Sequence, residues 1–231
     1  MKQALVLFSG GIDSTTALAW ARNRYDAVLA LTFDYGQRHR VEVRMARRAA
    51  RRLGIPQVVF PIRLDRIGGS ALTDPTIPLP RHRRVEEIGT GVPSTYVPFR
   101  NGIFLAVAAG LAEARGIPDI VCGFNVIDSP RYPDTRPAFV AAMTRAVRTG
   151  THPVPGRRRP RILAPFTGMR KSEIIRRGLA LRADYAWSVS CYAGREVPCG
   201  RCSSCLLRRR AWAEISRPDP LLVRLRKERR R

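Results

Sequence analysis

Short apolar runs alternate with longer segments of helical periodicity over most of the chain. Runs of strand length, bounded by turn residues, predict five buried strands at residues 4–8, 27–33, 57–62, 119–124 and 161–165. The segments between them predict helices that begin near residue 13 and cover residues 41–53, 102–115, 137–149 and 167–182. Regular alternation of strands and helices favours an α/β fold with a doubly wound, parallel five-stranded sheet.

Two regions depart from this alternation. Residues 65–93 are rich in glycine and proline, and so long a stretch without a regular pattern predicts either a mobile flap over a ligand site or a contact between subunits. After the last predicted helix, a cysteine-rich segment is followed by a basic end. We therefore divide the chain into an α/β domain (residues 1–183), a metal-binding helical appendage (184–216) and a basic, frayed tail (217–231).

A Ser-Gly-Gly-Ile-Asp-Ser turn joins the first predicted strand to the first predicted helix. Gly10 and Gly11 allow backbone angles that other residues avoid, so a ligand can approach the main chain closely. The N–H groups of the turn and the positive end of the helix dipole suit a phosphate. Asp13 beside such an anion indicates a shared divalent cation. The turn lacks the Walker A and G-x-G-x-x-G spacings, and it resembles the phosphate loop of the ATP pyrophosphatase superfamily.

Further polar residues fall where ligands bind in open α/β sheets. Tyr35 and Gln37 follow the second strand, and Arg100 and Asn101 precede the third helix. Lys171 lies in the first turn of a predicted helix, where the dipole disfavours a cation, and this indicates an anion nearby. The residues leave other readings open, namely a solvated lysine and a surface arginine followed by an asparagine N-cap.

Four of the five cysteines follow the spacing Cys-x7-Cys-x2-Cys-x2-Cys: Cys191, Cys199, Cys202 and Cys205. Four thiolates fill the tetrahedral shell of Zn²⁺, so the spacing predicts a closed, structural zinc site rather than a Lewis acid. An iron–sulfur cluster remains the alternative. Cys122 lies in an apolar strand and is predicted to be a small core residue.

The net charge of +24 suggests a nucleic-acid partner at first sight. All but three of the 42 basic residues are arginines, however, and they occur in every element, which indicates genomic base composition rather than a binding patch. We predict no stable nucleic-acid partner, and ordinary surface positions for His39, His82 and His152. No apolar run reaches the roughly 18 residues of a membrane span, and the first strand begins at once without a signal peptide, so we expect a cytoplasmic protein.

Several short motifs occur in a fixed order along the chain. They lie at residues 9–16, 35–39, 93–98, 100–101, 132–134, 171–173 and 187–188, followed by the four cysteines. Through this ordered set the chain resembles the 7-cyano-7-deazaguanine synthase family of the queuosine pathway, a branch of the ATP pyrophosphatase (PP-loop) superfamily. The resemblance implies an adenine-nucleotide α-hydrolase-like fold with a C-terminal zinc knuckle. It also implies an ATP-dependent carbon–nitrogen ligase that converts 7-carboxy-7-deazaguanine and ammonia, through the amide, to the nitrile.

The same resemblance implies the site residues. The catalytic candidates are Asp13, Ser14, Arg100 and Lys171, with Mg²⁺ near the first of them. The candidates for holding ATP are Phe8, Ser9, Gly10, Gly11, Ile12, Asp13, Ser14, Thr15, Thr16, Ala17 and Leu18. The candidates for the deazaguanine are Tyr35, Gln37, Asn101, Tyr132, Asp134 and Arg136. The carboxylate of Asp134 would accept hydrogen bonds from ring N–H groups. A homodimer that uses free ammonium is implied as well.

Two positions depart from the family pattern, and both bear on specificity. Thr135 stands where the family commonly has cysteine, and Phe99 stands where glycine is frequent. Two other functions therefore remain as alternatives. One is a tRNA-thiolating PP-loop enzyme, which would need a redox-active cysteine pair near the loop. The other is a relative that modifies or binds a protein.

Overall fold

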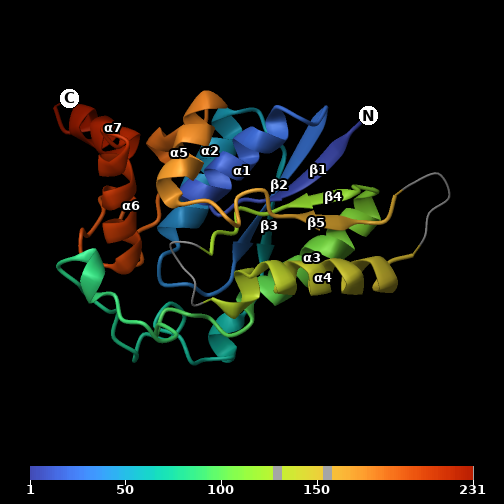
Figure 1. Ribbon diagram of the computed structural model, residues 1–231, viewed down its shortest axis with the longest axis horizontal. Helices are drawn as coiled ribbons and strands as arrows, with labels where there is room; N and C mark the ends of the chain where they lie inside the picture. Colours follow the sequence, from blue (N-terminus) through green and yellow to red (C-terminus); the bar gives the residue numbers. More distant parts are fainter. Residues whose placement is uncertain (127–131, 153–157, 231) are drawn as a thin grey trace.

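Five parallel strands form one sheet in the computed structural model, which describes residues 1–126, 132–152 and 158–230 (Figure 1). The order across the sheet is β3-β2-β1-β4-β5, so the direction of winding reverses between β1 and β4. The strands are β1 (Gln3–Leu7), β2 (Ala27–Asp34), β3 (Gln57–Pro61), β4 (Asp119–Val121) and β5 (Arg161–Leu163). The predicted parallel five-stranded α/β sheet is confirmed, and ligands bind such sheets at the point of reversal.

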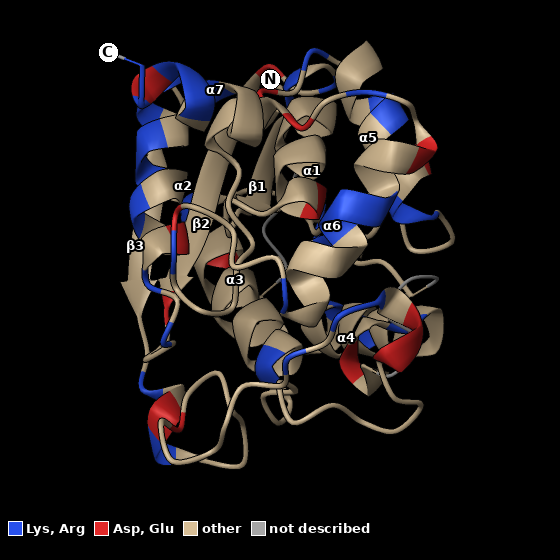
Figure 2. Ribbon diagram, turned by 90° about the vertical axis from the view of Figure 1, so that its left-hand side faces the viewer, with Lys and Arg blue, Asp and Glu red and all other residues tan. Residues whose placement is uncertain are grey.

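Helices cover both faces of the sheet. Helices α1, α2 and α5 lie on one face, α3 and α4 lie on the other, and α6 and α7 lie at the end where the strands terminate (Figure 1). Their bounds are α1 (Ile12–Arg22), α2 (Val41–Arg52), α3 (Arg100–Arg115), α4 (Pro137–Gly150), α5 (Lys171–Ala180), α6 (Ser203–Glu214) and α7 (Pro220–Glu228). Figure 2 looks onto the strand-end side and shows α6 in front of the sheet.

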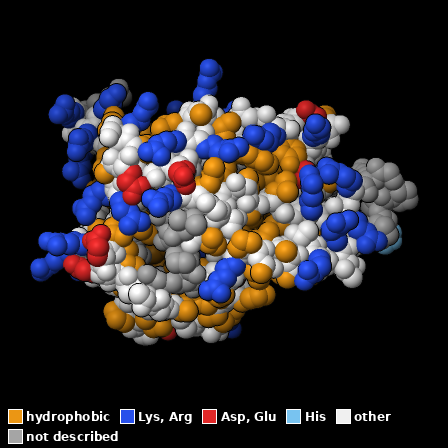
Figure 3. Space-filling model, viewed as in Figure 1, with side chains coloured by type: hydrophobic (Ala, Val, Ile, Leu, Met, Phe, Trp, Pro, Cys, Tyr) orange, Lys and Arg blue, Asp and Glu red, His pale blue; other side chains and the backbone are white. Residues whose placement is uncertain are grey.

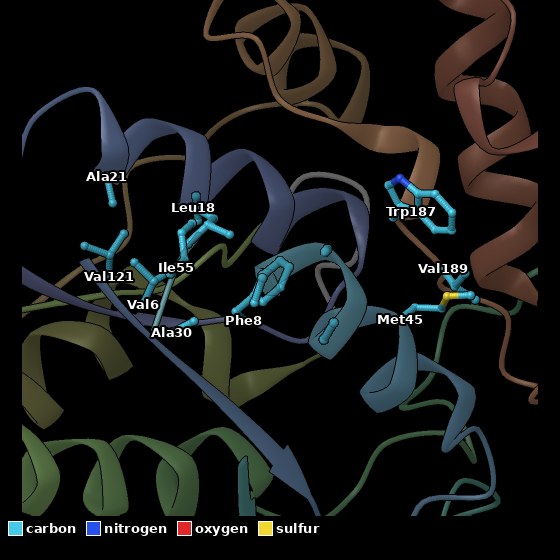
Figure 4. Close-up of a cluster of buried hydrophobic side chains, with 14 of the residues drawn as sticks. Val6, Phe8, Leu18, Ala21, Ala30, Met45, Ile55, Val121, Trp187 and Val189 are labelled. Atoms are coloured by element: carbon cyan, nitrogen blue, oxygen red, sulfur yellow. The ribbon is translucent and has the colours of Figure 1, made fainter. Parts of the chain in front are cut away.

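The core between the sheet and helices α1, α2 and α5 includes residues from the C-terminal segment. Phe8 at the end of β1, Leu18 of α1 and Met45 of α2 are almost fully buried, and Trp187 and Val189 pack into the same cluster (Figure 4). The segment after residue 183 therefore shares the core of the α/β layers. The domain boundaries predicted from the sequence stay a prediction.

The glycine- and proline-rich segment is anchored to the rest of the fold. Ala71 and Leu72 are buried, and the carbonyl of Leu72 accepts a 2.8 Å hydrogen bond from the Arg38 amide after β2. Further along, the amide of His82 donates to the carbonyl of Arg201, at 2.8 Å, just before α6. The segment thus connects the turn after β2 with the cysteine-rich region. Its predicted roles as a mobile flap or a subunit contact stay predictions.

The prediction of a frayed tail is wrong for Pro220–Glu228, which form helix α7. Leu221 is fully buried, and Asp219 caps the helix by accepting from the Leu221 amide at 3.0 Å. The Asp219 carboxylate also receives two hydrogen bonds from the buried guanidinium of Arg208 in α6, one of them 2.7 Å long. The tail folds because its fully buried apolar residue, Leu221, and its cap both find partners far away in the sequence.

Removing the anchor of α7 is expected to destabilise the protein. Leu221→Ala leaves a cavity in a fully buried position and is expected to lower the free energy of unfolding by roughly 2–5 kcal/mol. The matched control is Leu222→Ala, because Leu222 is 39% exposed; a change within about 0.5 kcal/mol is expected there. Urea denaturation of both variants measures the difference. Equal effects at the two positions would mean that α7 does not pack as described.

Candidate active site

The glycine turn after β1 lies at the point where the sheet reverses. Gly10 has φ of +82°, in the left-handed region that glycine tolerates, and Gly11 is the extended N-cap of α1. A Cβ atom at Gly123, which follows β4, would lie 2.6 Å from the carbonyl oxygen of Asp13. The end of β4 therefore approaches the turn closely enough that only glycine fits. The Ser14 hydroxyl lies 3.1 Å from both the Ser9 hydroxyl and the Gly11 carbonyl.

An ion pair joins the starts of α1 and α5. The Lys171 ammonium donates to both carboxylate oxygens of Asp13, at 2.7 and 2.9 Å. The Lys171 side chain is 16% exposed and the Asp13 side chain 24%, so the pair is largely shielded from solvent. The carboxylate of Asp13 is thus an anion beside Lys171, as expected.

A cavity of about 280 Å³ opens beside this pair. Its lining includes the polar Ser9, Ser14 and the Asp13–Lys171 pair, and further charged residues such as Glu42 and Arg100. It also includes an apolar and aromatic set, here called the aromatic slot: Leu31, Phe33, Leu72, Phe104, Cys122 and Phe124. Polar groups and aromatic rings in one cavity match the two parts of a nucleotide or a phosphorylated heterocycle.

Tyr35 and Arg100 meet in the wall of the cavity. The guanidinium of Arg100 lies 3.5 Å from the Tyr35 hydroxyl and 5.9 Å from the Phe104 ring centre. Burial raises the pKa of Tyr35 well above its usual value, so its hydroxyl stays neutral at physiological pH. Arg100 is the first residue of α3, and helix α3 begins two residues before its predicted start. The left-handed conformation of Phe99, with φ of 51°, turns the chain into this helix.

The substrate-binding candidates divide into two groups. Tyr35, Asn101 and Tyr132 line the cavity, as does Thr135, the residue that departs from the family pattern. Gln37, Asp134 and Arg136 are not among the cavity-lining residues. Of the ATP-binding candidates, Phe8, Ser9, Gly11, Ile12, Asp13 and Ser14 line the cavity, whereas Gly10, Thr15, Thr16, Ala17 and Leu18 do not.

Gln37 and Asp134 instead hydrogen bond to the main chain. Gln37 is buried; its side-chain oxygen accepts from the Tyr35 amide at 2.6 Å and its amide nitrogen donates to the Phe33 carbonyl at 3.2 Å. Asp134 is 2% exposed, and one carboxylate oxygen accepts from the Asn101 amide at 2.9 Å, in the first turn of α3. Its other oxygen, Oδ1, is buried without a partner among the described residues. An acceptor left in this state is available for a ligand donor.

The surface position predicted for His39 is wrong. His39 is 3% exposed and lines the cavity together with Glu42, Tyr192 and Arg208, none of which was a site candidate from the sequence. Its position directly before α2 and three residues from Glu42 is a helical spacing that pairs side chains, and this was the available signal. Arg208 belongs to a run of three arginines and carries no such signal.

The four predicted ligand cysteines come together as a cluster. The sulfur atoms of Cys191, Cys199, Cys202 and Cys205 all lie within 4.8 Å of one another. The sulfurs of Cys199 and Cys205 are 3.9 Å apart, close to the roughly 3.8 Å expected between thiolates on one tetrahedral zinc ion. Main-chain N–H groups donate to two of the sulfurs, at 3.4 Å each. The set therefore fits a metal, and it leaves no open coordination position.

A family model supplies the identification. The model of the family described as "Queuosine biosynthesis protein QueC" matches residues 3–216 of the chain. The chain belongs to the QueC family. The QueC match begins at the first strand and ends after helix α6, so it includes the glycine turn, the cavity and the cysteine cluster.

Curated relatives agree with the QueC assignment over nearly the full length. The 7-cyano-7-deazaguanine synthase of Azotobacter vinelandii is 46% identical over 95% of this chain and 97% of its own. The enzyme of the same name from Methylococcus capsulatus is 46% identical over 97% of this chain and 100% of its own. That from Frankia casuarinae is 47% identical over 94% of this chain and 92% of its own.

A solved structure shares the fold. A 4-thiouridine synthetase in complex with RNA and ATP superposes with a TM-score of 0.50 at 22% identity, covering 97% of this chain and 53% of that one. At this identity the likeness concerns the fold alone. Within the described ranges, no helix of this QueC family member has the length and apolar character needed to cross a membrane.

Proposed function

We propose that this protein is an ATP-dependent carbon–nitrogen ligase that converts 7-carboxy-7-deazaguanine and ammonia, through the amide, to 7-cyano-7-deazaguanine, releasing AMP and diphosphate. The observation that carries the proposal is the cavity, in which the Ser9–Ser14 turn and Lys171 lie beside an aromatic slot. The family assignment and the names of the relatives support the choice of substrate.

The chemistry explains why such a site is needed. A carboxylate oxygen is a poor leaving group, so transfer of AMP from ATP to that oxygen prepares the carbonyl carbon for attack by ammonia. Transfer of a second AMP to the amide oxygen allows loss of that oxygen, with the two N–H protons, to give the nitrile. In both steps diphosphate leaves, and positive charge beside it lowers the barrier.

The residues of the site divide this work among them. The N–H groups and hydroxyls of the Ser9–Ser14 turn would hold the departing diphosphate. Asp13 fits a Mg²⁺ ion, because an ionised carboxylate at a phosphate site is a typical magnesium ligand. Lys171 and Arg100 would stabilise the developing negative charge, and Mg²⁺ when bound would add to this. Tyr35, Asn101 and Tyr132 would contact the deazapurine.

The four-cysteine cluster would hold Zn²⁺ with a structural role. All four ligand positions would be filled by sulfur, so the metal would have no site for substrate. The arrangement also argues against tRNA thiolation. Outside the cluster, Cys122 is the remaining cysteine; it lines the cavity, but burial raises the pKa of its thiol well above the usual range. A single protonated thiol does not supply the reactive pair that thiolation needs.

One assay tests the proposal. The purified protein is incubated with 7-carboxy-7-deazaguanine, ammonium and Mg-ATP, and amide, nitrile and AMP are followed by mass spectrometry. We expect both products, with AMP formed only when the acid is present. A protein that binds ATP yet forms neither amide nor nitrile would contradict the proposal and would favour a role in modifying or binding a macromolecule.

Asp134 provides a test of substrate recognition. Asp134→Ala removes the buried Oδ1 that lacks a partner, and we expect the KM for 7-carboxy-7-deazaguanine to rise roughly 10- to 100-fold, the value of a hydrogen bond to a charged group. The matched control is Asp184→Ala, which removes the capping carboxylate of another turn, at Tyr185–Trp187. If Asp134→Ala leaves this KM unchanged and lowers only the melting temperature, Asp134 is merely the cap of α3.

We also propose the protein's environment and assembly. The expected states are a cytoplasmic homodimer that takes free ammonium and forms no stable complex with nucleic acid. The cations on the face shown in Figure 3 are spread over many elements and separated by apolar and uncharged side chains, which supports a compositional origin of the charge. RNA binding at nanomolar concentration near physiological salt would contradict this part of the proposal.

A further inference from the structure

His39 is a buried histidine in the wall of the cavity. Its Nε2 atom lies 3.3 Å from the Oε1 oxygen of Glu42 and 3.3 Å from the Tyr35 hydroxyl. The other ring nitrogen, Nδ1, is buried and has no partner among the described residues. A hydrogen bond from Nε2–H to the Glu42 carboxylate leaves the Nδ1 lone pair as an acceptor, which is the arrangement of a carboxylate–histidine base.

The surroundings hold the imidazole and the carboxylate in place. The ring of Tyr35 meets the His39 ring edge-on at 6.2 Å, and the Tyr192 ring lies 5.8 Å away on another side. Glu42 also accepts a 3.3 Å hydrogen bond from Gln37. The groups that face His39 are thus the carboxylate of Glu42 and the phenols of Tyr35 and Tyr192, with the Arg100 guanidinium reaching Tyr35 from α3. Of these groups, Tyr192 also packs against the cysteine cluster.

The proposed ligation needs such a proton acceptor. Ammonium must lose a proton before its nitrogen can attack, and the amide nitrogen must lose two protons to become a nitrile. Among the described residues of the cavity wall, Asp13 is paired with Lys171, and one oxygen of Glu42 lies 3.3 Å from both His39 and Gln37. Burial raises the pKa of both Tyr35 and Cys122. Histidine is the residue type whose ordinary pKa lies close to neutrality, as a general base requires.

We propose that His39, oriented by Glu42, is the general base that removes protons from the reacting nitrogen; this inference rests on the proposed function. In the first stage, ammonium gives a proton to the imidazole, the nitrogen forms a bond to the acyl carbon, and the bond from that carbon to the AMP oxygen breaks; the departing AMP phosphate takes the second N–H proton, which leaves the neutral amide. The imidazolium returns its proton to solvent before the second stage. There the adenylated amide loses its two N–H protons in succession, one to His39 and one to the departing AMP phosphate, as the carbon–oxygen bond breaks.

The experiment separates activation of the acid from transfer of nitrogen. Exchange of labelled diphosphate into ATP, with 7-carboxy-7-deazaguanine and without ammonium, reports adenylation alone. His39→Gln is expected to keep this exchange within about threefold of wild type while amide and nitrile formation fall roughly 100- to 10,000-fold. Hydroxylamine, a neutral nucleophile at pH 7, is expected to restore trapping of the adenylated acid in the variant. His152→Gln, at an exposed histidine, is the matched control and is expected to behave as wild type.

Each outcome is decisive. If wild type shows neither exchange nor product, the proposed function fails. If wild type is active and His39→Gln still forms nitrile within about threefold of its rate, the inference about His39 is wrong. If His39→Gln loses both the diphosphate exchange and nitrile formation, the inference is also overturned, because His39 would then be needed to build the site. Should His39→Gln melt below the assay temperature, His39→Asn takes its place, and loss of exchange in both variants overturns the proposal.

Discussion

Asp13→Asn is expected to lower kcat for nitrile formation by roughly 100- to 1,000-fold while leaving the melting temperature close to that of wild type. Asparagine keeps the size and hydrogen-bonding capacity of the side chain but removes the charge that would hold Mg²⁺ beside the departing diphosphate. Asp13 lies at the surface of the cavity rather than in the core, so the fold does not depend on it. Steady-state kinetics with varied Mg²⁺ and circular dichroism on heating provide the two measurements.

Lys171 is the ion-pair partner of the Asp13 carboxylate, and its substitution provides a second test of the same site. Lys171→Met removes the ammonium that pairs with Asp13 at 2.7 Å, and kcat is expected to fall by a similar roughly 100- to 1,000-fold. Lys227→Met is the matched control, because Lys227 is an exposed lysine of α7 away from the cavity. Turnover like that of wild type in either Asp13→Asn or Lys171→Met would refute the role assigned to that residue.

Removal of the metal is expected to unfold the C-terminal segment. Structural zinc in four-cysteine sites contributes roughly 10–16 kcal/mol, which is as large as the whole stability of a typical domain. The cluster joins residues on both sides of a long loop, with Cys202 as the N-cap of α6 and Cys205 in its first turn. A strong chelator is therefore expected to release about one zinc per chain and to lower the melting temperature by more than about 10 °C.

Substitution of one ligand gives the specific form of this prediction. Cys202→Ser is expected to abolish stoichiometric metal binding, whereas Cys122→Ser, at a cysteine outside the cluster, is expected to retain it. Elemental analysis and an absorption spectrum measure both. Colourless protein with zinc supports the assignment; iron with visible absorption would replace zinc by an iron–sulfur cluster, and metal retained in Cys202→Ser would place the site elsewhere.

The sequence predicted the sheet and the glycine turn after β1 because both depend on local patterns. Strand-length apolar runs such as Leu5 to Phe8 form strands wherever helices cover them, and the Ser-Gly-Gly turn needs only the backbone freedom of Gly10. The cysteine cluster followed from spacing alone. Predictions of burial and of side-chain partners were less reliable, because they depend on residues that are distant in the sequence.

His39 and α7 show why. The burial of His39 depends in part on the C-terminal Tyr192, and the burial of Leu221 depends on the core around Trp187. Neither of these two partners lies in a local window of sequence. Gln37 was predicted to bind substrate; its side chain holds the turn after β2 by hydrogen bonds to the main chain, and a role in substrate binding stays a prediction.

A single main-chain hydrogen bond connects the metal-bearing end of the chain to the phosphate turn: the Val189 amide donates to the Gly10 carbonyl at 2.9 Å, and the neighbouring Ser188 is held by Arg208 of α6. If the cluster holds zinc and the turn holds ATP, as we propose, any effect of the metal on nucleotide affinity must appear in equal measure as an effect of the nucleotide on metal affinity. Slower loss of the metal in the presence of ATP would be the sign of such linkage.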